Sequence, residues 1–257
     1  MKLRLVSART GLSWVREGMR TFARQPLALT GLFFLYLAAI SITAQIPWIG
    51  GILALGLLPA ASLGLMAATR EAASGHFPMP TLLLSAFRAG RERLSAMVTL
   101  GAIYAAGFVF NAAVSALADH GHFARYMLNG QVTQQATQQS DFQLAMWIFM
   151  LLCIPLSLLF WHAPALVHWH GQPPVKSLFF SLVACWRNKG ALLVFALTWL
   201  GLFVAAAVLL GLVSVAMGST TFANVAMLPT VLLFAVVYFS SVYFSFRDSF
   251  VAEDPQP

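Results

Sequence analysis

The stretch GALLVFALTWLGLFVAAAVLLGLVSVAM, residues 190–217, is an apolar run without a charged side chain. A helix needs about 20 mainly apolar residues to cross the hydrocarbon core of a bilayer, so this run is long enough to do so. Five more runs free of Asp, Glu, Lys and Arg lie at about 27–46, 51–69, 94–117, 143–166 and 225–246. Each can satisfy its backbone as a helix without burying a formal charge in lipid. The pattern predicts six transmembrane helices.

The composition agrees with this interpretation. Apolar residues make up 60% of the chain and charged residues 9%, whereas about a quarter of the residues in a soluble domain are charged. The first run lies far from the start and lacks a small-residue cleavage site, so we expect a retained span and no removed signal peptide. The predicted fold is therefore all-α, a polytopic membrane helix bundle forming one integral membrane domain over residues 1–257.

The basic residues predict the orientation. Fourteen of the 15 Lys and Arg residues lie before the first run, in the loops after the second and fourth runs, or after the sixth, and only Arg125 lies on the other side. The positive-inside rule then places both termini in the cytoplasm. We expect 1–26 to be a cytoplasmic amphipathic segment, 118–142 an extracytoplasmic loop and 247–257 a cytoplasmic tail. The net charge of +7 follows from this topology, and no nucleic-acid partner is predicted.

The segment before the first run has helical periodicity. Apolar residues recur at Leu12, Val15, Met19 and Phe22, and a basic ridge on another face comprises Arg16, Arg20 and Arg24. The pattern predicts a helix on the cytoplasmic leaflet with its apolar face in the acyl boundary and its arginines at anionic headgroups. Alternatively, the arginines only set the topology.

An internal repeat occurs at an offset of 96 residues. The two copies are GHFPMPTLLLSAFRAGRER, residues 75–93, and GQPPVKSLFFSLVACWRNK, residues 171–189. Each predicts a Gly/Pro turn, a short interfacial helix ending in basic residues, and entry into the next span. The N-terminal segment has the same order, so we expect three hairpins, each preceded by a cytoplasmic interfacial helix. Arg91, Arg187 and Lys189 join the predicted headgroup contacts.

The second run carries a stripe of small residues at spacings of four. Its members are Gly56, Ala60, Gly64 and Ala68. Such a stripe lets another helix approach closely, so helix packing is the favoured interpretation and a substrate groove is the alternative.

The end of the fourth run contains three histidines, His162, His168 and His170. The first two diverge by roughly 120° around a helix, so they do not form the aligned pair typical of zinc-binding helices. Trp161 and Trp169 accompany them, as expected at a membrane boundary. We expect boundary anchoring, with a haem or metal site as the alternative, and we predict no cofactor.

Motifs for catalysis are lacking. The sequence has no Gly-rich phosphate loop, paired catalytic carboxylates or nucleophile elbow, so we do not expect an enzyme. The spans also lack the ionisable residues of proton-coupled carriers. We predict a scaffold or accessory factor in envelope or membrane homeostasis, whose partners are the lipid bilayer, especially anionic phospholipids, and a membrane protein or a second copy of the chain. The alternatives are a passive or partner-driven conduit for lipid or a small amphiphile, and a haem- or metal-binding membrane protein.

Five motifs carry a resemblance to a family. They are SARTGLSWVREG (7–18), FARQPLAL (22–29), PTLLLSAFRAG (80–90), FWHAPALVHWHGQPPVKSLFFS (160–181) and YFSFRDSF (243–250). The chain resembles a group of proteobacterial six-helix inner-membrane proteins known as hypothetical transmembrane proteins. This resemblance implies location and helix count, and it assigns a role to no residue. More loosely, the chain is similar to the membrane region of some glycerophosphodiester phosphodiesterases, but it shows no phosphodiesterase domain, so no catalysis is implied.

Overall fold

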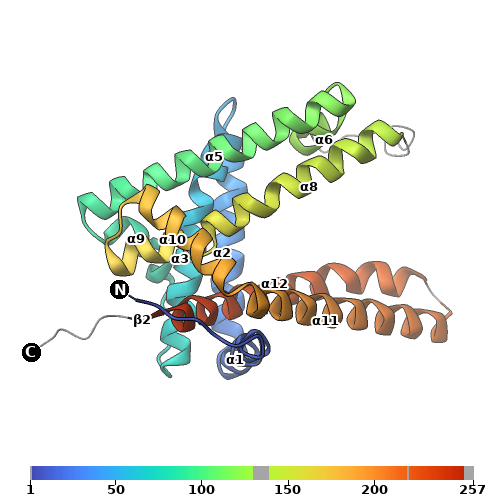
Figure 1. The fold of residues 1–257 in the computed structure, drawn as a ribbon. Coiled ribbons are helices and arrows are strands. Elements are labelled where there is room, and N and C mark those ends of the chain that lie inside the picture. Colours follow the sequence, from blue (N-terminus) through green and yellow to red (C-terminus); the bar gives the residue numbers. More distant parts are fainter. Residues whose placement is uncertain (1, 130–138, 219, 252–257) are drawn as a thin grey trace, which may run out of the picture. The chain divides into compact units, whose positions relative to one another are not determined.

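The computed structural model describes residues 2–129, 139–218 and 220–251, and almost all of them are helical (Figure 1). The longer helices are α1 (Thr10–Arg24), α2 (Pro26–Ala44), α3 (Gly50–Ala73), α5 (Arg91–Asp119), α8 (Ser140–Phe160), α10 (Pro174–Arg187), α11 (Lys189–Ala216) and α12 (Thr220–Ser249). The shorter elements are η1 (Pro80–Leu84), α4 (Ser85–Arg88), α6 (His122–Asn129), α9 (Ala163–His170), and the strands β1 (Lys2–Leu3) and β2 (Phe250–Val251).

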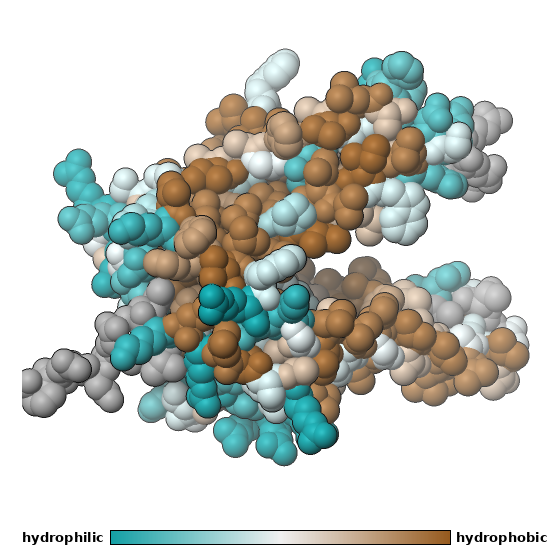
Figure 2. All heavy atoms as spheres, in the orientation of Figure 1, coloured by the Kyte–Doolittle hydropathy of each residue, from teal (hydrophilic) through white to brown (hydrophobic). Residues whose placement is uncertain are grey.

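Six helical segments are long and apolar enough to cross a membrane. They are Pro26–Ala44, Gly50–Ala73, Arg91–Asp119, Ser140–His170, Lys189–Ala216 and Asn224–Ser249. Figure 2 shows apolar residues over long stretches of the helix surfaces. The predicted all-α membrane fold with six spans is thus confirmed. The predicted extracytoplasmic loop is described only in part, since residues 130–138 lie outside the described residues, as do residues 252–257 of the predicted tail.

The chain forms two compact units. The first comprises Met1–Tyr36, Ser62–Ser85 and Ala184–Pro257. In it, α1 packs against α11 and α12. Two glycines permit this approach. A Cβ atom on Gly11 would clash with the carbonyl oxygen of Ala191, and one on Gly18 would lie 2.6 Å from the Cβ atom of Ser241. β1 pairs antiparallel with β2 and so joins the two ends of the chain.

Aromatic side chains fill much of the first unit's core. The rings of Trp14 and Phe195 lie 6.0 Å apart between α1 and α11. Tyr238 on α12 lies 5.7 Å from Phe195 and 5.7 Å from Trp199. Such tilted and edge-to-face pairs add to the gain from burial alone, so they help to hold α1, α11 and α12 together.

The second unit comprises Leu37–Ala61 and Ala86–Val183. Its largest contact runs between α5 and α8, which lie side by side (Figure 1). Near α6, a buried cluster of Phe123, Phe142, Ala145 and Phe149 closes this pair of helices. Closer to the start of α5, the glycines of α3 and α5 meet, because a Cβ atom on Gly101 would clash with the carbonyl oxygen of Gly56.

The fourth span is interrupted between α8 and α9. Pro164 follows the break, and proline both lacks an N–H and clashes with the carbonyl four residues earlier. The Ser181 hydroxyl of α10 occupies the gap. It accepts a hydrogen bond from the His162 N–H at 2.9 Å and donates one to the Leu158 carbonyl at 2.8 Å. A serine from another helix therefore replaces the backbone bond that would have joined residues 158 and 162.

The two repeat copies have the same order of elements. Each opens at a glycine with a positive φ, +85° at Gly75 and +62° at Gly171. In each, a short helical segment, a break and a long helix follow. The first copy divides its short segment into η1 and α4, whereas the second forms the continuous α10.

Candidate lipid-contact sites

The apolar face of α1 contacts protein. Trp14, Val15 and Gly18 are buried on this face, which packs against α11 and α12. Val15 is only 1% exposed, so the prediction that it lies in the acyl boundary is wrong. The physical reason is that Gly11 and Gly18 let the helix approach protein backbone closely, and this contact takes up part of the surface that periodicity alone assigned to lipid. Met19 on the same predicted face is 39% exposed, and Leu12 and Phe22 are half-buried, so lipid contact of these three residues stays a prediction.

The basic ridge of α1 lies on the other side of the helix. Arg16, Arg20 and Arg24 are all exposed, and successive members are four residues apart, so they follow one face. In the part of the chain that the structure describes, none of them forms a salt bridge. The ridge therefore presents three cations to an external anion, although lipid contact there stays a prediction.

Polar contacts hold α1 to the end of α12. The Trp14 indole N–H donates to Asp248 Oδ2 at 3.0 Å. Arg247 donates to both carboxylate oxygens of Glu17, at 2.8 and 3.1 Å, and its guanidinium carbon lies 4.9 Å from the centroid of the Phe244 ring. No role was predicted for these residues from the sequence. The signal was present, because Trp14 and Glu17 belong to one of the motifs that carry the family resemblance and the other three belong to another.

Asn188 joins three segments of the first unit. Its side-chain oxygen accepts from the Val6 N–H at 3.0 Å. Its amide nitrogen donates to the Arg4 carbonyl at 3.1 Å and to the Ser249 hydroxyl at 3.3 Å. Asn188 is buried and immediately precedes α11, so it ties the N-terminal segment to the start of α11 and the end of α12. Sequence reasoning missed it.

The other predicted headgroup residues are divided between the two units. Arg91 belongs to the second unit, and Arg187 and Lys189 belong to the first. All three are exposed. The Lys189 ammonium lies 5.2 Å from the centroid of the Trp186 ring.

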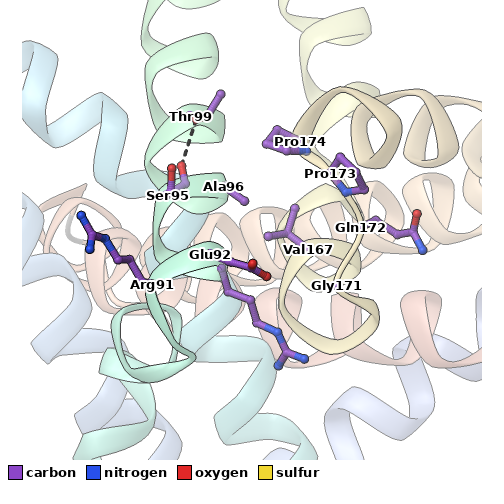
Figure 3. Close-up of a pocket in the computed structure, with 11 residues that line it drawn as sticks. Arg91, Glu92, Ser95, Ala96, Thr99, Val167, Gly171, Gln172, Pro173 and Pro174 are labelled. Atoms are coloured by element: carbon purple, nitrogen blue, oxygen red, sulfur yellow. Dashed lines mark hydrogen bonds between the residues drawn. The ribbon is translucent and has the colours of Figure 1, made fainter.

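A pocket of about 710 Å³ lies in the second unit, between the start of α5 and the turn from α9 to α10 (Figure 3). Its charged lining residues are Arg91, Glu92 and Arg93. Gly171 and Pro174 line the opposite wall. The pocket thus contains side chains of both charges beside a glycine and proline turn.

The small-residue stripe of α3 is divided between two surroundings. Gly56 and Ala60 line an apolar groove of about 500 Å³ in the second unit, formed with α5 residues that include Val98 and Ala102. Gly64 lies in the first unit, where a Cβ atom on it would be 2.7 Å from the Cα atom of Leu83. Ala68 is fully buried. Close packing and a groove therefore both occur along this one stripe.

The three histidines occupy different positions on α9. His162 is buried at its N-cap, and His168 and His170 lie in its last turn. The His168 and Trp169 rings lie 6.2 Å apart. Across residues 2–129, 139–218 and 220–251, no three His, Cys, Asp or Glu side chains form a group that could hold a metal ion. The structure therefore does not bring these three histidines together as metal ligands.

Comparisons with known proteins place the chain in a family. No family model and no solved structure matches it. It is 37% identical over 259 aligned residues to a probable inner membrane protein of Burkholderia thailandensis, and the alignment covers 99% of this chain and 96% of that protein. The six apolar helices agree with a multi-pass inner-membrane location. The chain therefore belongs to the same family of bacterial inner membrane proteins as this relative.

Proposed function

We propose that the protein is a non-enzymatic scaffold or accessory factor in envelope or membrane homeostasis that gathers anionic phospholipids at the cytoplasmic face of the inner membrane. The observation that carries this proposal is the exposed ridge of Arg16, Arg20 and Arg24 on a helix whose opposite face is fixed to α11 and α12. The looser similarity to the membrane region of glycerophosphodiester phosphodiesterases has no support in the comparisons, and the proposal does not depend on it.

The geometry of α1 makes the expected lipid contact electrostatic. Trp14 and Glu17 bond to the end of α12, so the ridge is held in one orientation. Each arginine near an anionic leaflet contributes about 1 kcal/mol, so three contribute about 3 kcal/mol, which corresponds to roughly a hundredfold in affinity at low salt. Because the buried face of α1 is not free to enter the bilayer, salt should weaken this contact strongly.

The test replaces all three arginines with glutamine. The full chain is reconstituted in nanodiscs that contain phosphatidylglycerol and phosphatidylcholine, and retained phosphatidylglycerol is counted by native mass spectrometry at increasing salt. We expect the triple Gln variant to retain far less of it at low salt and to lose the salt dependence. A triple Lys variant, which keeps the charges, and Arg125→Gln, which removes one charge at the opposite predicted face, serve as controls. Equal retention by the Gln variant and the unmodified protein would remove the basis of the proposal.

A second candidate function is a conduit for lipid. The apolar groove between α3 and α5 favours it, because a groove of about 500 Å³ on a pair of membrane-spanning helices is chemically suited to an acyl chain. Ala102→Phe would fill the groove, whereas Ala106→Phe adds the same bulk at an exposed position outside the lining. In proteoliposomes, a conduit predicts that only the first change slows the exchange of a fluorescent phospholipid between leaflets. If the lipid exchanges between leaflets at the same rate in proteoliposomes as in protein-free vesicles, the protein is not a conduit.

A further inference from the structure

The pocket between α5 and the α9–α10 turn lies where membrane headgroups are expected. One candidate span begins at Arg91 and another ends at His170, and the pocket is formed by residues adjoining both positions. Its wall includes the apolar side chains of Ala96, Val167 and Pro173. A headgroup entering here would therefore meet charged groups at the mouth and apolar groups beside its glycerol.

One part of the pocket favours an anion. Arg93 lines it, and α5 begins beside it without a side-chain cap on its first N–H groups. The start of a helix carries the positive end of its dipole and unpaired N–H donors, which suit a phosphate. An arginine adds charge-assisted hydrogen bonds to the same kind of ligand.

The other part favours a cation. Figure 3 shows Glu92 directed toward Val167 and Gly171, whereas Arg91 points away from them. Glu92 is exposed, and within the described parts of the chain it forms no salt bridge. α9 ends and α10 begins at this wall, so the opposed dipoles of the two helix ends offset each other. The carboxylate of Glu92 is therefore the group that suits an ammonium.

We infer that this pocket binds a phosphoethanolamine group, with its phosphate at Arg93 and the start of α5 and its ammonium at Glu92. This ligand carries both charges in one short unit, as the pocket does. A phosphatidylglycerol headgroup has no cation for Glu92, and a phosphocholine ammonium has no N–H to donate. The inference goes beyond the proposed function, because it concerns another unit and another lipid class than the ridge of α1.

The test is a competition among three lipids with identical acyl chains. The purified full chain in detergent is titrated with phosphatidylethanolamine, phosphatidylcholine and phosphatidylglycerol, and bound lipid is measured by native mass spectrometry. A charged hydrogen bond lost with the choline headgroup predicts about a tenfold preference for phosphatidylethanolamine over phosphatidylcholine. Glu92→Gln should reduce this ratio to about one, and Arg93→Gln should weaken both lipids, since both carry the phosphate.

Two variants serve as controls. Arg88→Gln removes an exposed charge of the same unit that does not line the pocket, so it should preserve the preference for phosphatidylethanolamine. Glu92→Asp keeps the carboxylate and should retain part of that preference. Equal binding of the ethanolamine and choline lipids by the unmodified protein would overturn the inference, as would an unchanged ratio in a folded Glu92→Gln variant.

Soluble glycerophosphoethanolamine identifies the source of the ligand. If it displaces the lipid at comparable concentration, the pocket takes the free zwitterion, and if it does not, the pocket takes the membrane lipid. Both results keep the chemistry inferred for the site. The triple Gln variant of α1 should lose phosphatidylglycerol while its ratio of ethanolamine to choline lipid stays unchanged, so failure here is distinguishable from failure of the proposed function.

Discussion

α1 and α10 precede different spans and have the same predicted role of a surface helix, but they differ in the apolar side chains that they expose. α1 buries Trp14 and Val15 against protein and exposes its arginines. α10 also exposes its basic residues, but Val175, Phe179 and Trp186 are exposed with them, at 71%, 60% and 67%. The helix with the clearer amphipathic pattern is therefore not the one that offers an apolar face to lipid.

Small side chains distinguish the protein-facing side of both helices. On α1 this side carries Gly11 and Gly18, and on α10 it carries Ser177, Ser181 and Ala184. Lipid tails are as apolar as leucine, so bulky apolar residues gain little by leaving lipid, whereas small residues gain close contact with another backbone. Small residues, more than apolar ones, mark the buried side here.

The strongest test of this comparison is Gly11→Ala. The added Cβ atom would meet the backbone carbonyl of Ala191, which cannot rotate away. We expect a loss of about 2–3 kcal/mol, at the upper end of overpacking effects, measured by thermal unfolding in detergent. Gly201→Ala is the matched control, because no atom lies within 4 Å of the new Cβ atom, and its better helix propensity should add about 0.5–1 kcal/mol. If the two variants have the same stability, the close contact at Gly11 does not hold α1 against α11.

The equivalent test on α10 is Ser181→Ala. Removing the hydroxyl leaves the His162 N–H and the Leu158 carbonyl without the bridge between them. We expect destabilisation of about 1–2 kcal/mol from the loss of these two buried hydrogen bonds, measured in the same unfolding assay. Ser177→Ala is the control, because among the described residues that hydroxyl donates to the Pro174 carbonyl of its own helix and bridges no second helix. A Ser181 variant as stable as this control would contradict a structural role for the bridge.

The features of the fold that could be predicted are those that depend on a short segment of sequence. Span number follows from uncharged length, and the ridge of Arg16, Arg20 and Arg24 follows from their spacing, since both are properties of a short segment. The bond from Trp14 to Asp248 joins residues 234 positions apart, and no periodicity contains that information. Asn188 likewise bonds to Val6 and Ser249, so its role needed the folded chain.

The break in the fourth span depends both on a local residue and on a distant one. The effect of Pro164 on its helix is local, but the fourth run was predicted as one continuous span, about 143–166, and the break was not expected. The group that satisfies the broken backbone is Ser181, which lies 19 residues after His162. The same limit applied to Val15, whose burial depends on α11 and α12. Periodicity therefore predicted where a helix is amphipathic, and packing decided which partner each face received.

Trp14 on α1 and Trp186 on α10 should differ in their contact with lipid. Trp186 is exposed on α10 beside Val175 and Phe179, whereas Trp14 is 1% exposed and bonded to Asp248. In bilayers with brominated acyl chains, whose bromines quench indole fluorescence on contact, Trp186→Phe should remove more of the quenchable signal than Trp14→Phe. Its effect on stability should be the smallest of the three tests, within about 0.5 kcal/mol, because it alters a single exposed side chain. Trp14→Phe should instead lower the unfolding temperature and leave the quenched fraction unchanged. If Trp186→Phe leaves quenching unaltered, the exposed apolar face of α10 does not contact lipid. The small residues would then not mark the only side of α10 that contacts protein.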